Sequence, residues 1–136
     1  MCSSCCGDAK QLAYAGTTQL AMGGREQVQR AITSARAAIQ LYCCAEDDDQ
    51  SVGDLFAAHL DLARGHLLLG HLEGTGVMLE YVLGSAPERM SASIVRRITD
   101  LGRELKGPQY VGTAQATHVR ERLQHTAALA ASTTAP

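Results

Sequence analysis

Apolar residues recur every three or four positions through most of this chain, which is the spacing of an amphipathic helix. No segment shows the strict alternation of apolar and polar residues that is typical of a strand. Glycines interrupt the pattern at Gly23-Gly24 and again at Gly70, where turns are expected. The pattern therefore predicts an all-α protein, with helices over residues 8–22, 26–43, 54–70, 72–83, 90–106 and 114–131.

One helical domain over residues 25–131 is predicted, with a short segment at either end. Residues 1–24 form a cysteine-containing segment with one weak helix, because Gly16 and the two threonines after it are poor helix formers. Residues 1–7 are expected to be mobile, and residues 132–136 to be a disordered tail.

Two polar motifs are interpreted as the beginnings of helices. The acidic run at residues 46–51 lacks the alternating ligands and glycine of a calcium-binding loop, so we interpret it as a solvated loop that leads into a helix. Ser85 and Glu88 are three residues apart, which predicts a capping box for the helix that follows them.

The composition limits the classes of function. Of the 136 residues, 46% are hydrophobic but only 4% are aromatic, so the core must consist of Leu, Ala, Val and Ile. The formal net charge of −2 argues against an extended nucleic-acid surface, which needs clustered Lys and Arg. No apolar run is long enough to span a bilayer, and no signal peptide is recognisable. A cytoplasmic protein that has no contact with the membrane is expected.

The five cysteines do not resemble a disulfide framework, because their number is odd and four of them form two adjacent pairs. Reduced thiols are the preferred interpretation. The alternative is a metal or redox sensor, in which Cys2-Ser-Ser-Cys5 and the adjacent pair Cys43-Cys44 supply the ligands or thiols.

No motif in the sequence indicates an enzyme. The serine elbow Gly-x-Ser-x-Gly is absent, and Gly74-Thr75-Gly76 lacks both the third glycine and the preceding strand of a dinucleotide fingerprint. Arg96-Arg97 belongs to a local basic cluster, which is either a solvated face or a receptor for an acidic peptide or a phosphate group. No catalytic residue, cofactor or metal site is therefore predicted.

The region from residue 54 to 87 resembles a tetratricopeptide repeat. Its turn glycine corresponds to Gly70 and its terminal proline to Pro87, while Leu62-Ala63, Leu72 and Leu79 occupy packing positions. Departures from the family pattern are His59 for Trp, His66 for an aromatic residue, Thr75 for Ala and Val82 for a later Ala. The resemblance implies a right-handed array of antiparallel helical hairpins, or α-solenoid.

A second resemblance covers about residues 31–129. The short motifs of this region, from Ala-Ile-Gln-Leu-Tyr at 38–42 to Gln-Tyr-Val-Gly at 109–112, follow one another in an order that resembles the C-terminal helical-repeat region of actinobacterial helix-turn-helix (XRE-type) transcriptional regulators. In that family a DNA-binding domain precedes the repeats. Residues 1–24 show no such pattern, so direct DNA binding is not expected.

These observations predict an interaction or sensing domain linked to transcriptional regulation, whose partner is a protein or a peptide. Its binding site is expected on the concave face of the array. Self-association as a homo-oligomer and the action of a degenerate regulator fragment with a separate DNA-binding chain remain open alternatives. For His59 and His66, packing against neighbouring side chains is preferred over ligand binding. The predicted site residues are His59, Arg64, His66, Arg96 and Arg97.

Overall fold

A computed structural model of the protein describes residues 3–42, 49–85, 87–110 and 112–134, with the backbone alone at 3–10 and at a few other positions. The described residues form six α-helices and two short 3-10 helices and contain no strand, so the all-α class is confirmed. The helices are α1 (Ser3–Met22), α2 (Arg25–Tyr42), α3 (Asp49–Leu68), α4 (Leu72–Leu83), η1 (Pro87–Arg89), α5 (Ala92–Glu104), η2 (Pro108–Tyr110) and α6 (Ala114–Thr134).

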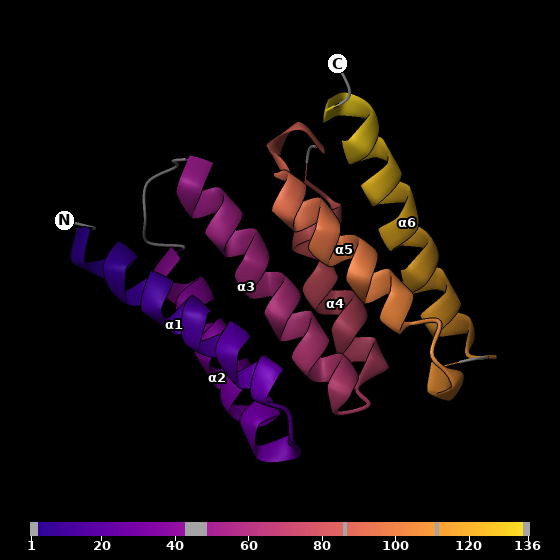
Figure 1. The fold of residues 1–136 in the computed structure, drawn as a ribbon, viewed down its shortest axis with the longest axis horizontal. Coiled ribbons are helices and arrows are strands. Elements are labelled where there is room, and N and C mark those ends of the chain that lie inside the picture. The colour runs from indigo at the N-terminus through magenta and orange to yellow at the C-terminus, as the bar shows by residue number, and fades with distance from the viewer. Residues whose placement is uncertain (1–2, 43–48, 86, 111, 135–136) are drawn as a thin grey trace.

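Helix α3 lies at the centre of the molecule and contacts α1, α2, α4 and α5. Figure 1 shows α1, α3 and α5 side by side on the face toward the viewer, with α2 and α4 behind them. Along the chain, α1 packs against α2, α3 against α4, and α5 against α6. No helix in the described part of the chain is both long and apolar enough to cross a membrane.

The main apolar core lies on one side of α3, between α3, α4, α5 and α6. Phe56, Leu79, Ile98 and Leu123 are fully buried there. On the other side of α3, smaller clusters join it to α1 and α2 through Ala13, Ala38, Ala58 and neighbouring residues. The buried members of these clusters are mainly alanines, so α1 and α2 approach α3 closely, while larger side chains such as Ile32 and Leu69 pack around them partly buried.

The turn between α3 and α4 is a glycine-terminated helix end. Gly70 has a φ of 80°, a left-handed conformation that favours glycine. The His71 N–H donates to the His66 carbonyl at 2.8 Å, and the Gly70 N–H donates to the Leu67 carbonyl at 3.0 Å. This is the Schellman pattern, which satisfies the last carbonyl groups of a helix. The turn predicted at Gly70 is therefore confirmed.

The contact between α2 and α3 depends on a second glycine. Gly65 is buried, and a Cβ atom added to it would lie 2.7 Å from Ile32 Cγ1. Asp61 and Gly65 interrupt the apolar pattern of α3, which would place them on its exposed polar side, yet both residues are buried. Helical periodicity identified the apolar face of α3 but not the helices that cover its other faces.

Helix ends differ from the sequence prediction at both ends of the chain. Helix α1 begins at Ser3 rather than at residue 8, and α6 continues to Thr134 rather than ending at 131. The weak helix formers of α1 are accommodated by tertiary contacts, since Gly16 lies against the α2 backbone and Thr17 bonds to α3. Helix α3 begins at Asp49, inside the acidic run that was predicted to be a loop.

The predicted capping box at Ser85 is also wrong. The Ser85 hydroxyl donates to the Tyr81 carbonyl at 2.6 Å and closes the end of α4. The N-cap of α5 is Ser91, whose hydroxyl accepts the Ile94 N–H at 3.3 Å. The short helix η1 lies between them, so the true cap comes six residues later than the motif suggested.

Candidate functional site

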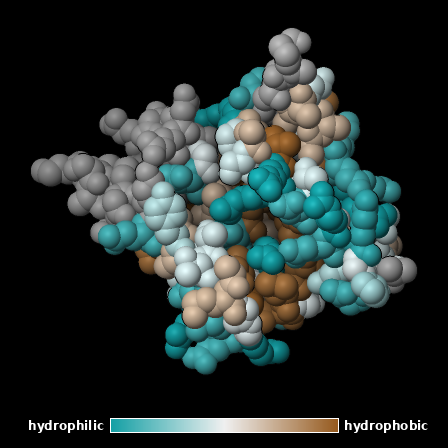
Figure 2. All heavy atoms as spheres, viewed as in Figure 1, coloured by the Kyte–Doolittle hydropathy of each residue, from teal (hydrophilic) through white to brown (hydrophobic). Residues whose placement is uncertain are grey.

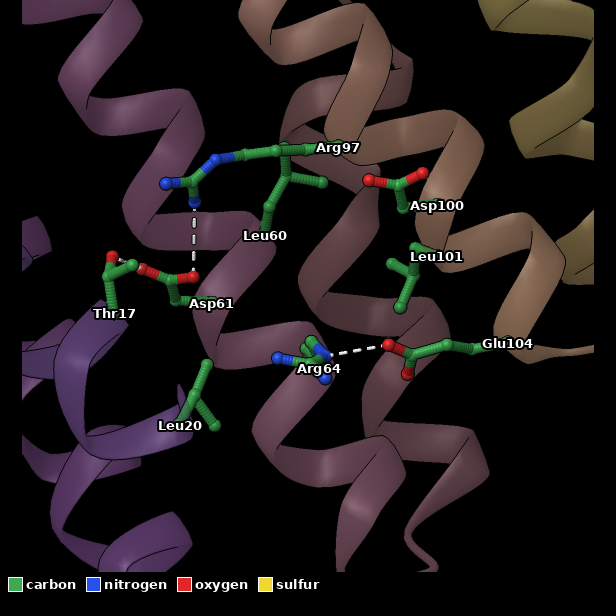
Figure 3. Close-up of a pocket in the computed structure, with 9 residues that line it drawn as sticks. All are labelled: Thr17, Leu20, Leu60, Asp61, Arg64, Arg97, Asp100, Leu101 and Glu104. Carbon is green, nitrogen blue, oxygen red and sulfur yellow. Dashed lines mark hydrogen bonds and ion pairs between the residues drawn. The ribbon is translucent and has the colours of Figure 1, made fainter. Parts of the chain in front are cut away.

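A hollow of about 300 Å³ opens between α1, α3 and α5, on the face seen in Figure 1. Each of the three helices supplies part of its wall, although the helices are far apart in the sequence (Figure 3). The lining residues are Thr17 and Leu20 from α1, Leu60, Asp61 and Arg64 from α3, and Arg97, Asp100, Leu101 and Glu104 from α5.

The hollow combines apolar and charged groups. Leu20, Leu60 and Leu101 are its apolar lining residues, and all three are buried. Figure 2 shows hydrophobic residues at the bottom of a recess on this face, with hydrophilic side chains around them. A ligand would therefore meet both a surface that favours apolar contacts and several charged hydrogen-bonding groups.

Asp61 is a buried carboxylate at the centre of the polar contacts. Its Oδ2 atom lies 2.6 Å from Thr17 Oγ1 of α1, and its Oδ1 atom lies 3.1 Å from Arg97 Nη1 of α5. Burial raises the pKa of Asp61 above its ordinary value, while the Thr17 hydroxyl and the charges of Arg97 and Arg64 limit that rise. One side chain thus links all three helices of the hollow.

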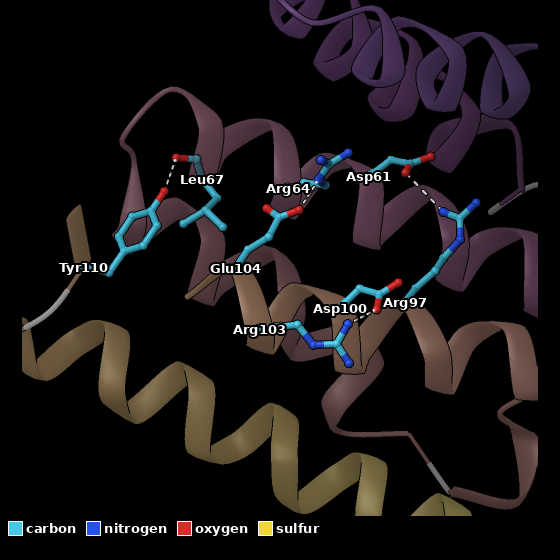
Figure 4. Close-up of polar contacts among 8 residues, drawn as sticks. All are labelled: Asp61, Arg64, Leu67, Arg97, Asp100, Arg103, Glu104 and Tyr110. Carbon is cyan, nitrogen blue, oxygen red and sulfur yellow. Dashed lines mark hydrogen bonds and ion pairs between the residues drawn. The ribbon is translucent and has the colours of Figure 1, made fainter. Parts of the chain in front are cut away.

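A second ion pair crosses the hollow between α3 and α5. Arg64 Nε donates to Glu104 Oε1 at 2.8 Å (Figures 3 and 4). About 41% of the Arg64 side chain is exposed, and among the described residues its two Nη atoms make no hydrogen bond. Arg97 likewise engages only Nη1 within the described part of the chain. Both guanidinium groups therefore retain donors that a ligand could use.

Further polar contacts fix the position of α5 and the segment after it. Figure 4 shows Tyr110 of η2 donating from its hydroxyl to the Leu67 carbonyl, at 3.3 Å. Asp100 and Arg103, one helical turn apart on α5, form an exposed ion pair at 3.4 Å. Tyr110 ties the chain after α5 back to the end of α3, which helps to set the separation of the two helices that form the hollow.

Of the predicted site residues, Arg64 and Arg97 lie together in the hollow. Arg96 is exposed and is not among its lining residues, although it is adjacent to Arg97 in the sequence. His59 and His66 are also on α3 but are not part of the hollow. The sequence analysis grouped these five residues on one concave face, whereas only Arg64 and Arg97 among them line the hollow.

His59 packs against an aromatic residue. Its ring stacks on Tyr81 with ring centroids 4.5 Å apart, and Phe56 lies 5.6 Å from Tyr81. Burial lowers the pKa of His59, and a backbone hydrogen bond with Met78 opposes that change. An imidazole ring stacked on a phenol ring is a packing arrangement, in agreement with the preference for packing over ligand binding at this histidine.

His66 lies between α2 and the turn before α4. Its Nε2 atom is 3.5 Å from Arg36 Nη2, and its ring approaches Gly74 so closely that a Cβ there would be 3.3 Å from Nδ1. Burial lowers the pKa of His66, and the positive charges of Arg36 and His71 add to this effect. The cationic neighbours make this position unsuited to an additional cation.

Sequence reasoning missed the carboxylates of the hollow and Thr17. A signal was present, because Arg97, Asp100 and Glu104 are three and four residues apart and so share one face of α5. Asp61 and Arg64 have the same relation on α3. Thr17 gave no such signal, since its role depends on how α1 packs against α3.

The cysteine-based alternative lies outside what the structure describes. Cys2, Cys43 and Cys44 fall outside the described residues, and Cys5 and Cys6 lie in the part of α1 where only the backbone is described. Among the described residues, no group of three or more His, Cys, Asp or Glu side chains could hold a metal ion.

Comparison with known proteins gives no relative for this chain. No family model matches it, and neither a curated protein nor a solved structure shows significant similarity. The geometry of the hollow and the sequence resemblances are therefore the basis for a functional proposal.

Proposed function

We propose that this chain is a non-enzymatic interaction domain that binds an extended peptide, or a segment of a partner protein, in the hollow between α1, α3 and α5. One observation carries this proposal: three helices distant in the sequence jointly supply apolar side chains and charged groups of both signs to one hollow. Extended peptides present backbone carbonyl and N–H groups together with side chains, and such a surface can satisfy all of them.

The resemblance to tetratricopeptide repeats supports the same function. In this proposal α1–α2, α3–α4 and α5–α6 are three antiparallel hairpins of a right-handed α-solenoid, and the first helix of each hairpin lines the concave face. Thr75, which replaces the family's small Ala, is fully buried. Its hydroxyl lies 3.3 Å from the Ala63 carbonyl and 3.0 Å from the His71 carbonyl, so the substitution is compatible with close packing of the hairpin.

The resemblance to helix-turn-helix regulators supports a role in transcriptional regulation. Recognition of a partner by these helices would then influence a DNA-binding unit, supplied by another chain or by another part of the same protein. Direct contact with nucleic acid is not part of the proposal, because the chain carries a formal net charge of −2.

Arg64 is the residue best placed to contact a ligand. Its Nε atom is already oriented by Glu104, and its Nη atoms make no hydrogen bond with the described residues. A guanidinium held in this way loses little conformational freedom when it binds a carboxylate or a backbone carbonyl. Arg97 has a different role, because it neutralises the buried Asp61 and stabilises the hollow itself.

Selection from a displayed library of random peptides, followed by calorimetry on purified protein, would test this function. We expect selected peptides to shift backbone amide NMR signals of α1, α3 and α5 around the hollow. Arg64→Met should weaken their binding about ten- to a hundredfold, since a hydrogen bond to a charged group contributes about 1.5–3 kcal/mol.

Arg96→Met is the matched control, because it removes an exposed arginine outside the hollow. It should leave the affinity unchanged. NMR shifts confined to α2, α4 or α6 would overturn the assignment of the site, as would equal affinities for wild type and Arg64→Met. A library that yields no binder would contradict peptide recognition itself.

A further inference from the structure

We infer that the binding groove continues from the hollow to the turn between α1 and α2. Its charge distribution then favours one order of acidic and basic residues along the bound peptide. An acidic residue beside an apolar residue would occupy the end near this turn, and a basic residue would occupy the end near Asp100. This inference rests on the proposed function and specifies which peptides that function would recognise.

A second hollow, of about 380 Å³, extends the first one along α1 and α3. The two hollows share Leu20 and Arg64 among their lining residues, so they are adjacent parts of one groove. The second hollow is lined by Leu20, Gly23, Gly24, Arg25, Val28, Arg64, Leu68 and Leu69.

The second hollow is cationic and apolar. Arg25 and Arg64 are the ionisable side chains of its lining, and no carboxylate is among the lining residues. Because Arg64 is paired with Glu104, Arg25 supplies the positive charge of this hollow that no described carboxylate neutralises. Arg25 is exposed and forms no ion pair with any described residue. Leu68 presents an apolar surface there, with 45% of the residue exposed. A carboxylate together with an apolar side chain matches this end in both charge and hydropathy.

The first hollow has the opposite charge balance. Its lining contains three carboxylates and two arginines, and two of the carboxylates are already neutralised: Asp61 by Arg97, and Glu104 by Arg64. Asp100 remains, because its side chain is 55% exposed and its ion pair with Arg103 is long, at 3.4 Å. A lysine or arginine of the peptide would therefore be attracted to Asp100, at the far end of the groove from Arg25.

Charge reversal on both molecules tests this order. Peptides selected from the random library on wild-type protein should carry an acidic residue next to an apolar one, and a basic residue further along. Arg25→Glu should weaken such a peptide about five- to tenfold, and replacing the acidic residue of the peptide by lysine should restore its affinity for this variant. Asp100→Lys should likewise weaken the peptide, and replacing the basic residue of the peptide by glutamate should restore its affinity for this variant.

Arg96→Glu is the control, because it reverses the charge of an exposed arginine that does not line the first hollow. It should not change the preference for either charged residue. Peptides that shift the NMR signals around the groove but bind wild type and Arg25→Glu equally well would overturn the charge order and leave the proposed function intact. Peptides that are apolar throughout would also overturn it. Binding outside the groove would overturn both proposals.

Discussion

Because α2 approaches α3 closely at Gly65, we expect Gly65→Ala to lower the free energy of unfolding. The added methyl group would lie 2.7 Å from Ile32 Cγ1 and 3.3 Å from Ile32 Cδ1. Carbon atoms in favourable contact are about 3.5–4.0 Å apart, so Ile32 or one of the helices must move by roughly 1 Å. Isoleucine in a helix strongly prefers one χ1 rotamer, so its Cγ1 atom cannot simply rotate away.

The expected loss of stability follows from two opposing effects. Overpacking a filled interface costs about 1–3 kcal/mol, while replacing glycine by alanine inside a helix stabilises by about 0.5–1 kcal/mol. Gly65→Ala should therefore lower the free energy of unfolding by about 0.5–2 kcal/mol. Gly53, on the same helix, is the matched control, because a Cβ there would meet no atom within 4 Å. Gly53→Ala should raise the free energy of unfolding by about 0.5–1 kcal/mol.

Urea unfolding followed by far-ultraviolet circular dichroism measures these differences. The two single variants should move the unfolding midpoint in opposite directions. In a double-mutant cycle, Ile32→Ala should reduce the cost of Gly65→Ala, because it removes the two carbon atoms that the new methyl group would meet. If Gly65→Ala is as stabilising as Gly53→Ala, the proposed close contact between α2 and α3 is wrong.

Two further predictions concern single polar groups. Burial raises the folded-state pKa of Asp61 above the value of 3.8 in the unfolded chain. Between these two pKa values the folded protein retains a proton that the unfolded chain releases. The free energy of unfolding of the wild type should therefore fall, relative to that of Asp61→Asn, as the pH rises from 3.8 through the raised pKa. Parallel pH profiles of the two proteins in urea unfolding would contradict this. Ser91→Ala should lower the free energy of unfolding by about 1 kcal/mol through loss of the bond to the Ile94 N–H, and Ser85→Ala should cost less. Equal losses would argue against Ser91 as the cap.

Periodicity predicted the elements of this fold better than it predicted their surroundings. Ile94, Ile98, Leu101 and Leu105 on α5 are three or four residues apart and all four are buried, because apolar spacing determines which face of a helix turns inward. By the same rule the polar Asp61 would be placed on the exposed side of α3, and this placement is wrong. Its burial depends on α1 and α5 lying on either side of α3, which no local pattern encodes.

The residues of the proposed binding site show the same difference between what local sequence and what tertiary packing determine. Arg64 and Arg97 were both predicted as residues of a concave binding face, and the structure places both in one hollow. What the sequence did not provide was the set of groups that orient them. Glu104 lies 40 positions after Arg64, and Asp61 lies 36 positions before Arg97, so these pairs exist only once α3 and α5 are packed together.

The two sides of the proposed groove are attached to the molecule with unequal strength. Helix α5 belongs to the main core, whereas α1 is joined to α2 and α3 through smaller clusters whose buried members are mainly alanines. Regions with few large buried apolar contacts open at a lower free energy than the global unfolding transition. The wall formed by α1 is thus the part of the groove that separates most readily from the rest of the molecule. A ligand that contacts both α1 and α5 would stabilise their association. Under the proposed function, occupancy of the groove would lower the frequency with which α1 and α2 separate from the rest of the molecule, without any rearrangement of the main core.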